Sequence, residues 1–143
     1  MWKGAGVPQG TEKSAPRQIV EQLNQALNNH DVAAGRALYA SDAHLVMASG
    51  HQLDLDGLDR LTSMTIKAFP DMRISVQRLV TDGETVITQE VLEGTHEGPF
   101  AGLAPTGKKI SLPIVHVTIV RAGQIVERIA YHDTAGILRQ LNS

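Results

Sequence analysis

Hydrophobic residues in the first part of the chain recur with the three-to-four residue spacing of an α-helix. After Ser14, which can cap a helix, the apolar positions Ile19, Val20, Leu23 and Leu27 form one stripe. Asp31 can cap a second, shorter helix, which we expect to continue to about Tyr39. The pattern therefore predicts two packed helices at the start of the folded region.

The next segment combines a short strand, a polar loop and a third helix. Residues 42–47 alternate as a strand does, and residues 49–55 are polar. A third helix is expected from near Asp56 to Phe69, because apolar residues again recur at helical spacing and Pro70 ends the pattern.

From Met72 onward the hydrophobic period changes to two, which is typical of strands. Asp82-Gly83 is a hairpin signal, and Ala122-Gly123 joins two further alternating runs. We expect strands at residues 72–82, 85–96, 110–121 and 124–133, and a terminal helix at residues 134–141.

Helices grouped before a meander of strands indicate an α+β fold rather than alternating α/β. A curved sheet wrapped against such helices leaves a cavity between the two layers, where small molecules commonly bind. We interpret residues 1–14 as a flexible N-terminal segment, because they are rich in glycine and polar residues, and residues 15–143 as one domain.

Composition narrows the class of protein. The 143 residues are 42% hydrophobic with a net charge of −2, so nothing favours binding to nucleic acid or to an anionic membrane. No apolar run approaches the roughly 18 residues of a membrane helix. There is no cysteine, which excludes disulfides and cysteine nucleophiles, and we expect a cytoplasmic protein.

Titratable residues gather at the ends of the last strands. Asp133 follows an apolar strand, where burial beside a cavity would raise its pKa and make it a general base; the alternative is a cap for the terminal helix. His116 lies in mid-strand on the same face as Ile114 and Thr118, and can shuttle a proton if that face lines the cavity.

Other candidates are assigned from strand parity and position. Tyr131 shares a face with Ile129 and could donate a hydrogen bond to an enolate, whereas His132 points to the opposite, outer face. His96 lies where a strand enters a glycine-rich loop, and either reaches the cavity or bonds the loop backbone. Glu90 in an otherwise apolar strand is either a buried acid or a solvated or interface residue.

Six histidines raise the question of a metal site. No pair of them has the spacing of a helical metal motif, so we expect no metal. The sequence also lacks the Gly-x-Ser-x-Gly turn of serine hydrolases.

Several short motifs resemble, in order, those of the SnoaL-like polyketide cyclase or ester cyclase family, within the nuclear-transport-factor-2-like superfamily. They are Phe69-Pro70-Asp71, Gly94-Thr95-His96-Glu97-Gly98-Pro99-Phe100, Pro105-Thr106-Gly107, Gly123-Gln124-Ile125-Val126-Glu127 and the closing segment Asp133 to Leu141. The resemblance implies a cone-shaped, curved mixed β-sheet packed against three N-terminal helices and enclosing a pocket. It also implies a homodimer formed through the outer sheet face.

The resemblance further implies cofactor-independent aldol chemistry, in which a carboxylate removes a proton beside a carbonyl. In the family pattern a histidine is followed fourteen residues later by the acid/base aspartate, and a second aspartate lies three residues beyond. His116 and Asp133 match the histidine and the second aspartate, but Ala130 stands at the acid/base position. Ile129 replaces a tryptophan common in this strand.

Three functions stay open from the sequence. The first is an enzyme acting on a small apolar carbonyl compound, with His116 and Asp133 as catalytic residues. For it we expect the ligand to be surrounded by Tyr131, His96, Ile129, Ile114, Phe100 and His51. The second is a non-catalytic binding protein for a small hydrophobic ligand, which Ala130 favours. The third is a partner-binding module whose cavity is filled by side chains.

Overall fold

The structure, a computed structural model, describes residues 14–143 of the chain. Four helices and six strands follow one another in the order α1 (Ala15–Asn28), α2 (Val32–Arg36), β1 (Tyr39–Val46), β2 (Gln52–Leu53), α3 (Leu55–Ala68), β3 (Arg73–Asp82), β4 (Thr85–Thr95), β5 (Lys109–Arg121), β6 (Gln124–His132) and α4 (Thr134–Asn142). None of the helices in this range is long and apolar enough to cross a membrane.

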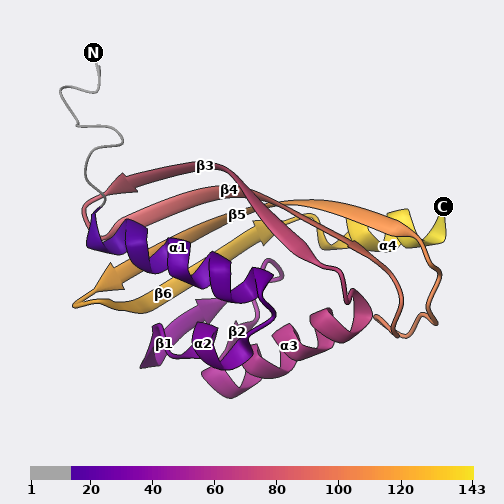
Figure 1. Cartoon of the computed structure of the whole chain (residues 1–143), viewed down its shortest axis with the longest axis horizontal. Coiled ribbons are helices and arrows are strands. Elements are labelled where there is room, and N and C mark those ends of the chain that lie inside the picture. The colour runs from indigo at the N-terminus through magenta and orange to yellow at the C-terminus, as the bar shows by residue number, and fades with distance from the viewer. Residues whose placement is uncertain (1–13) are drawn as a thin grey trace, which may run out of the picture.

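The six strands form one mixed sheet in the order β2-β1-β6-β5-β4-β3. All neighbouring pairs are antiparallel except β1 and β6, which run parallel. In Figure 1, α1 lies along the long strands β3–β6, while α2 and α3 lie beside β1 and β2. The sheet is curved and does not close. Helices α1 to α3 cover its concave face.

Aspartate and serine side chains begin each of the four helices. Ser14, Asp31, Asp54 and Asp133 each occupy the N-cap position and accept a hydrogen bond from a backbone N–H of the first turn. Such caps satisfy amide groups that otherwise have no partner within the helix. The local sequence thus fixes where the helices start, including those that surround the cavity.

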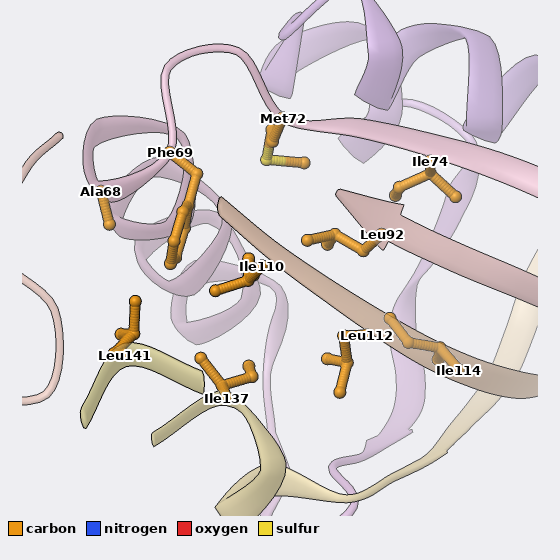
Figure 2. Packing of buried hydrophobic residues seen from close by; sticks show 10 residues of the cluster. All are labelled: Ala68, Phe69, Met72, Ile74, Leu92, Ile110, Leu112, Ile114, Ile137 and Leu141. Atoms are coloured by element: carbon orange, nitrogen blue, oxygen red, sulfur yellow. The ribbon is translucent and has the colours of Figure 1, made fainter. Parts of the chain in front are cut away.

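One hydrophobic cluster joins the end of α3 to α4 and to the far halves of β3–β5. Figure 2 shows Phe69 beside Ile110, with Ile137 and Leu141 of α4 packed from the other side. A second cluster lies at the opposite end, between α1 and strands β1, β5 and β6, and includes Val20 and Ile125. These two clusters hold the helices onto the sheet at both ends and leave the middle for a cavity.

The predicted fold is confirmed: a curved mixed sheet, with three helices before its long strands. Two element assignments were wrong. The second helix ends at Arg36, and Tyr39 already begins β1. Within the polar loop, Gln52–Leu53 forms a short strand on β1. The segment predicted to be flexible, residues 1–14, lies outside the described residues except for Ser14.

Candidate functional site

A mainly apolar cavity of about 190 Å³, partly open to solvent, lies between the sheet and the helices. Helices α1, α2 and α3 and strands β3 to β6 all contribute to its wall. Most lining side chains are aliphatic, and the polar ones gather on β5 and β6 and at the mouth between α2 and α3. A small organic molecule fits such a space, with its polar groups directed toward the sheet.

A second, larger groove of about 780 Å³ lies between α1 and β3. It is open to solvent and lined mainly by long polar side chains, such as Gln22, Gln25 and Arg78. The smaller cavity is more apolar and less open to solvent, so it is the better candidate for chemistry that needs a dry environment.

The polar end of the cavity is built from neighbouring positions on β5 and β6. His116 pairs with Ala130 in the sheet register, and Thr118 pairs with Arg128. His116, Arg128 and Ala130 all line the cavity, and so does His132. Ala130 therefore lies on the cavity wall between larger side chains that carry nitrogen donors.

Behind this wall, a buried carboxylate holds the His116 ring. Glu90 of β4 is fully buried, and its Oε2 lies 2.9 Å from His116 Nδ1. The Thr88 hydroxyl donates to the same oxygen. Because an ionised carboxylate can only accept, Nδ1 must carry the proton, and Nε2 is left as the lone-pair nitrogen. No side chain of residues 14–143 hydrogen-bonds to Nε2.

The protonation states of this pair follow from its surroundings. Burial lowers the pKa of His116, Arg128 lowers it further, and Glu90 offsets only part of this effect. Burial alone would raise the pKa of Glu90, but the hydrogen bond from His116 and the nearby Arg128 charge keep it below its ordinary value. At neutral pH the pair is therefore a neutral imidazole beside a carboxylate, which is the state of a general base and its orienting partner.

Two further groups at the polar end can donate hydrogen bonds to a ligand. Burial raises the pKa of Tyr39, which lines the cavity, so its hydroxyl stays protonated. Arg128 is 7% exposed; its Nη1 donates to Thr118 Oγ1 at 3.3 Å, and its Nη2 lies 4.0 Å from Glu90 Oε2. Both groups can therefore donate hydrogen bonds to a ligand in the cavity.

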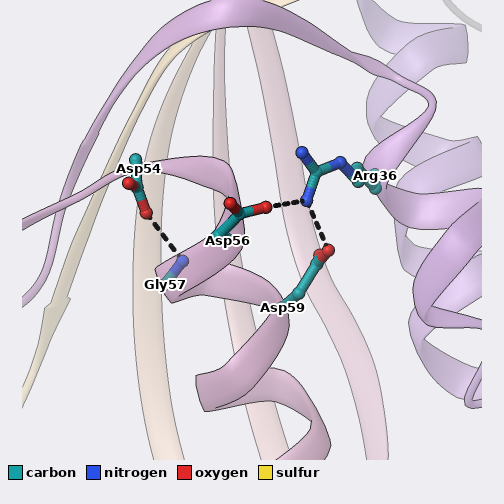
Figure 3. A network of polar contacts seen from close by, with 5 residues as sticks. All are labelled: Arg36, Asp54, Asp56, Gly57 and Asp59. Atoms are coloured by element: carbon teal, nitrogen blue, oxygen red, sulfur yellow. Dashed lines mark hydrogen bonds and ion pairs between the residues drawn. The ribbon is translucent and has the colours of Figure 1, made fainter.

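The mouth of the cavity is held by ion pairs between α2 and α3. Arg36 Nη1 lies 2.8 Å from Asp56 and 2.6 Å from Asp59, and Figure 3 shows it reaching across from α2. At the start of α3, the Asp54 side chain caps the helix by accepting a hydrogen bond from the Gly57 backbone N–H at 2.7 Å. Because Arg36 and Asp59 also line the cavity, these contacts fix the distance between the two helices that flank its entrance.

Of the residues predicted from sequence, His116 and Ile114 lie on the cavity wall. Asp133 does not. It caps α4, its side chain is 60% exposed and it forms an ion pair with Arg139. The expected rise in its pKa is wrong: the Arg139 hydrogen bond lowers the pKa, and this effect outweighs the opposing effect of burial.

The two faces of β6 are the reverse of the sequence interpretation. Tyr131 is 56% exposed on the outer face, and Ile129 is half-buried on that same side, so neither lines the cavity. His132, expected on the outer face, is on the cavity wall, where burial lowers its pKa. The physical reason is a register shift between Ile119 and Val120 in the β5–β6 ladder, because one extra residue moves every later side chain to the other face.

The remaining predicted residues lie away from the cavity. His96 is fully buried beside Phe69 and Phe100, and its Nδ1 accepts from Thr106 N at 3.2 Å. His96 thus supports the loop after β4, which was the alternative considered for it, and Phe100 packs with it. His51 is exposed at the turn before β2. None of these three lines the cavity.

Sequence reasoning missed Arg128 and Tyr39 and left Glu90 undecided. Tyr39 was assigned to a helix end. Arg128, which follows Glu127 in the strand, was not considered as a site residue. The signal for Glu90 was a lone acid in an otherwise apolar strand; in the structure its neighbours two residues away, Thr88 and Leu92, are also buried. Across residues 14–143, no three histidine, aspartate or glutamate side chains converge as a metal site requires.

Comparison with known proteins agrees with this architecture. Among proteins of curated function, none matches the chain at a significant level. IdmH from Streptomyces antibioticus, a proposed polyketide cyclase, is 31% identical over 90% of this chain and 99% of its own, with a TM-score of 0.80. AclR from Streptomyces galilaeus, a proposed hydroxylase, has a TM-score of 0.83 at 21% identity, over 89% of this chain and 80% of its own.

A proposed SnoaL-like polyketide cyclase from Jannaschia sp. CCS1 also has a TM-score of 0.83, at 18% identity over 94% of this chain and 99% of its own. At these two lower identities the likeness shows the fold alone. The sequence model of the SnoaL-like polyketide cyclase family matches residues 17–141, which is most of the chain. The chain therefore belongs to the SnoaL-like polyketide cyclase family.

Proposed function

We propose that this protein is a cofactor-independent enzyme of the cyclase or isomerase type. His116 would remove a proton from the carbon beside a carbonyl group of a small, largely apolar substrate. The observation that carries the proposal is the buried Glu90–His116 pair, 2.9 Å apart, with His116 on the wall of an apolar cavity. A neutral imidazole with a fixed tautomer is suited to accept a proton at Nε2.

Each neighbouring group has a separate part in this proposal. Glu90 is a positioning residue: it orients the ring and stabilises the imidazolium that forms when Nε2 takes the proton. The protonated Tyr39 hydroxyl would donate to the carbonyl oxygen as negative charge develops there. The aliphatic walls exclude water, which strengthens both interactions.

Deuterium exchange tests this function without knowledge of the natural substrate. We would incubate 2-tetralone and phenylpyruvate with the protein in D₂O and follow loss of the protons beside the carbonyl by NMR. The wild type should accelerate exchange over buffer. His116→Gln should lose about 10²- to 10⁴-fold of that acceleration, the usual contribution of a general base.

His51→Gln is the matched control, because this histidine is exposed and outside the cavity. It should exchange like the wild type. Exchange that is equally fast in His116→Gln, or never faster than in buffer, would refute the assignment. Binding of these ketones without exchange would instead favour a ligand-binding protein, the alternative suggested by Ala130.

We also propose that the protein is a homodimer formed through the outer sheet face. Valine and isoleucine side chains form one row across five strands in the sheet register: Val80, Ile87, Val117, Ile129 and Val46. Val80 is 58% exposed and Ile87 is 40% exposed, which is unusual for a continuous apolar row in a monomer. A second copy of the same face would cover it.

Val117→Lys places a charge at the centre of this row. In light scattering it should convert a dimer to a monomer, whereas Arg121→Lys, at an exposed strand end, should not. A wild type that is monomeric at tens of micromolar would overturn the dimer.

A further inference from the structure

A small recess opens from the cavity beside Ala130. It has a volume of about 50 Å³ and shares Tyr39, His116, Arg128 and Ala130 with the main cavity. Its remaining wall is apolar and comes from β1, the following Met47, and α3. Since a water molecule occupies roughly 30 Å³ of liquid, this is the space of a group of two or three heavy atoms.

Every polar side chain that lines the recess can donate a hydrogen bond. Tyr39 offers a hydroxyl and Arg128 a guanidinium, and His116 becomes a donor whenever its Nε2 is protonated. No aspartate or glutamate is among the residues that line it. The recess therefore favours an oxygen acceptor over a donor.

Arg128 makes few polar contacts with the rest of the protein. A guanidinium has five N–H donors, yet within residues 14–143 this one makes a single side-chain hydrogen bond, the long contact to Thr118. Its nearest carboxylate oxygen, on Glu90, is 4.0 Å away and already accepts from Thr88 and His116. Buried guanidinium groups are usually paired by carboxylates at shorter, often bidentate contact.

The recess exists because Ala130 has only a methyl side chain at this position. Its methyl group lies opposite His116 in the register, two positions along β6 from Arg128. An aspartate at this position would fill the recess and place a carboxylate near Arg128. With alanine, the donors remain but the carboxylate has to come from elsewhere.

We propose that the recess is a carboxylate-binding subsite and that the substrate is an oxo acid. The ligand carboxylate occupies the space above Ala130 and pairs with Arg128. The carbonyl group, one or two carbons further along, then lies near Tyr39, and its adjoining carbon faces His116 Nε2. This deepens the proposed function and rests on it for the reaction, but the binding itself needs no turnover.

Calorimetry with an unreactive probe tests the subsite. We would compare 3-phenylpropanoate with its neutral analogue 3-phenylpropanamide, because the two have the same apolar body and nearly the same shape. The wild type should bind the carboxylate about ten- to a hundred-fold more tightly, as expected for one buried charge-assisted interaction.

Two substitutions of Ala130 separate charge from size. Ala130→Asp should remove the preference for the carboxylate, because its own side chain occupies the recess and repels the ligand. Ala130→Asn adds nearly the same volume without charge, so it should weaken both ligands but keep a preference for the anion. Circular dichroism checks that both variants are folded.

Equal wild-type affinity for acid and amide would overturn the subsite, as would no measurable binding of either. An unchanged preference in folded Ala130→Asp would do the same. If the acid is preferred but phenylpyruvate does not exchange its protons, the subsite stands and the proposed reaction fails. If phenylpyruvate exchanges its protons but the acid is not preferred over the amide, the proposed reaction stands and the subsite fails.

Discussion

Replacing Glu90 by glutamine tests whether its buried charge holds the polar end of the cavity together. The substitution keeps the shape of the side chain and one oxygen acceptor but removes the negative charge. In the folded protein Glu90 Oε2 accepts from Thr88, lies 2.9 Å from His116 and is 4.0 Å from Arg128. The change therefore leaves the buried Arg128 guanidinium with no carboxylate nearby.

The expected loss of stability is about 3 kcal/mol. Removing one partner of a buried charge pair costs about 3–5 kcal/mol, because the other charge stays buried and uncompensated. At 4.0 Å and an effective dielectric constant near 20, the Coulomb attraction between Glu90 and Arg128 is about 4 kcal/mol. Glutamine can still accept one hydrogen bond, so the lower end of this range applies.

Urea unfolding at pH 7 measures the effect. Glu84→Gln is the matched control, because Glu84 forms an exposed ion pair with Arg121 at 3.1 Å and should contribute less than about 1 kcal/mol. Adding Arg128→Met to Glu90→Gln should cost less than the sum of the single changes, since it removes the uncompensated charge. A midpoint of Glu90→Gln equal to that of the wild type would refute this account of the site.

Three further predictions follow from local geometry and protonation. His116 has a lowered pKa in the folded state, so the unfolded chain binds its proton more tightly; stability should fall as pH drops below about 6.5, and less steeply in His116→Gln. Asp133→Ala removes the cap of α4 and should lower the thermal midpoint without changing the affinity for cavity ligands. Gly98→Ala should cost about 2–3 kcal/mol, because the new Cβ would lie 2.2 Å from the Lys67 carbonyl oxygen; Gly35→Ala, where the nearest atom is 3.6 Å away, should not destabilise.

The fold could be predicted because its signals are local. Ser14 and Asp31 cap the helices that their positions indicate, and the hairpin predicted from Asp82-Gly83 also forms, with Gly83 (φ 61°) and Glu84 as its two loop residues. Element boundaries were less certain where a strand and a helix meet, as at Tyr39. A tyrosine at the end of a helical pattern fits either structure, and only the parallel pairing of Tyr39 with Ile125 decides it.

The site could be predicted only in part, because it depends on register. Had β5 and β6 continued the pairing that starts at Arg121 and Gln124, His116 would lie opposite Ile129, and Tyr131 would face inward as the sequence interpretation held. Instead, the ladder passes from Val120↔Ile125 to Ile119↔Glu127, which inserts one residue. No glycine or proline marks the position of that bulge in the sequence, so strand alternation alone could not predict it.

The position of Ala130 changes the meaning of the missing carboxylate. By resemblance, the family pattern places an acid here, opposite His116, and alanine argued against catalysis. The structure has a carboxylate on the other side of the same histidine, at Glu90, buried and hydrogen-bonded to Nδ1. A carboxylate in that place cannot reach a ligand in the cavity, but it can make the imidazole a better base. In the function proposed above, His116 is the base, and the space beside Ala130 and Arg128 is open to an acidic group of the ligand. Ala130→Asp should therefore not restore an enzyme of the family type. It should compete with the ligand for Arg128, and it would lower the activity of the protein rather than raise it.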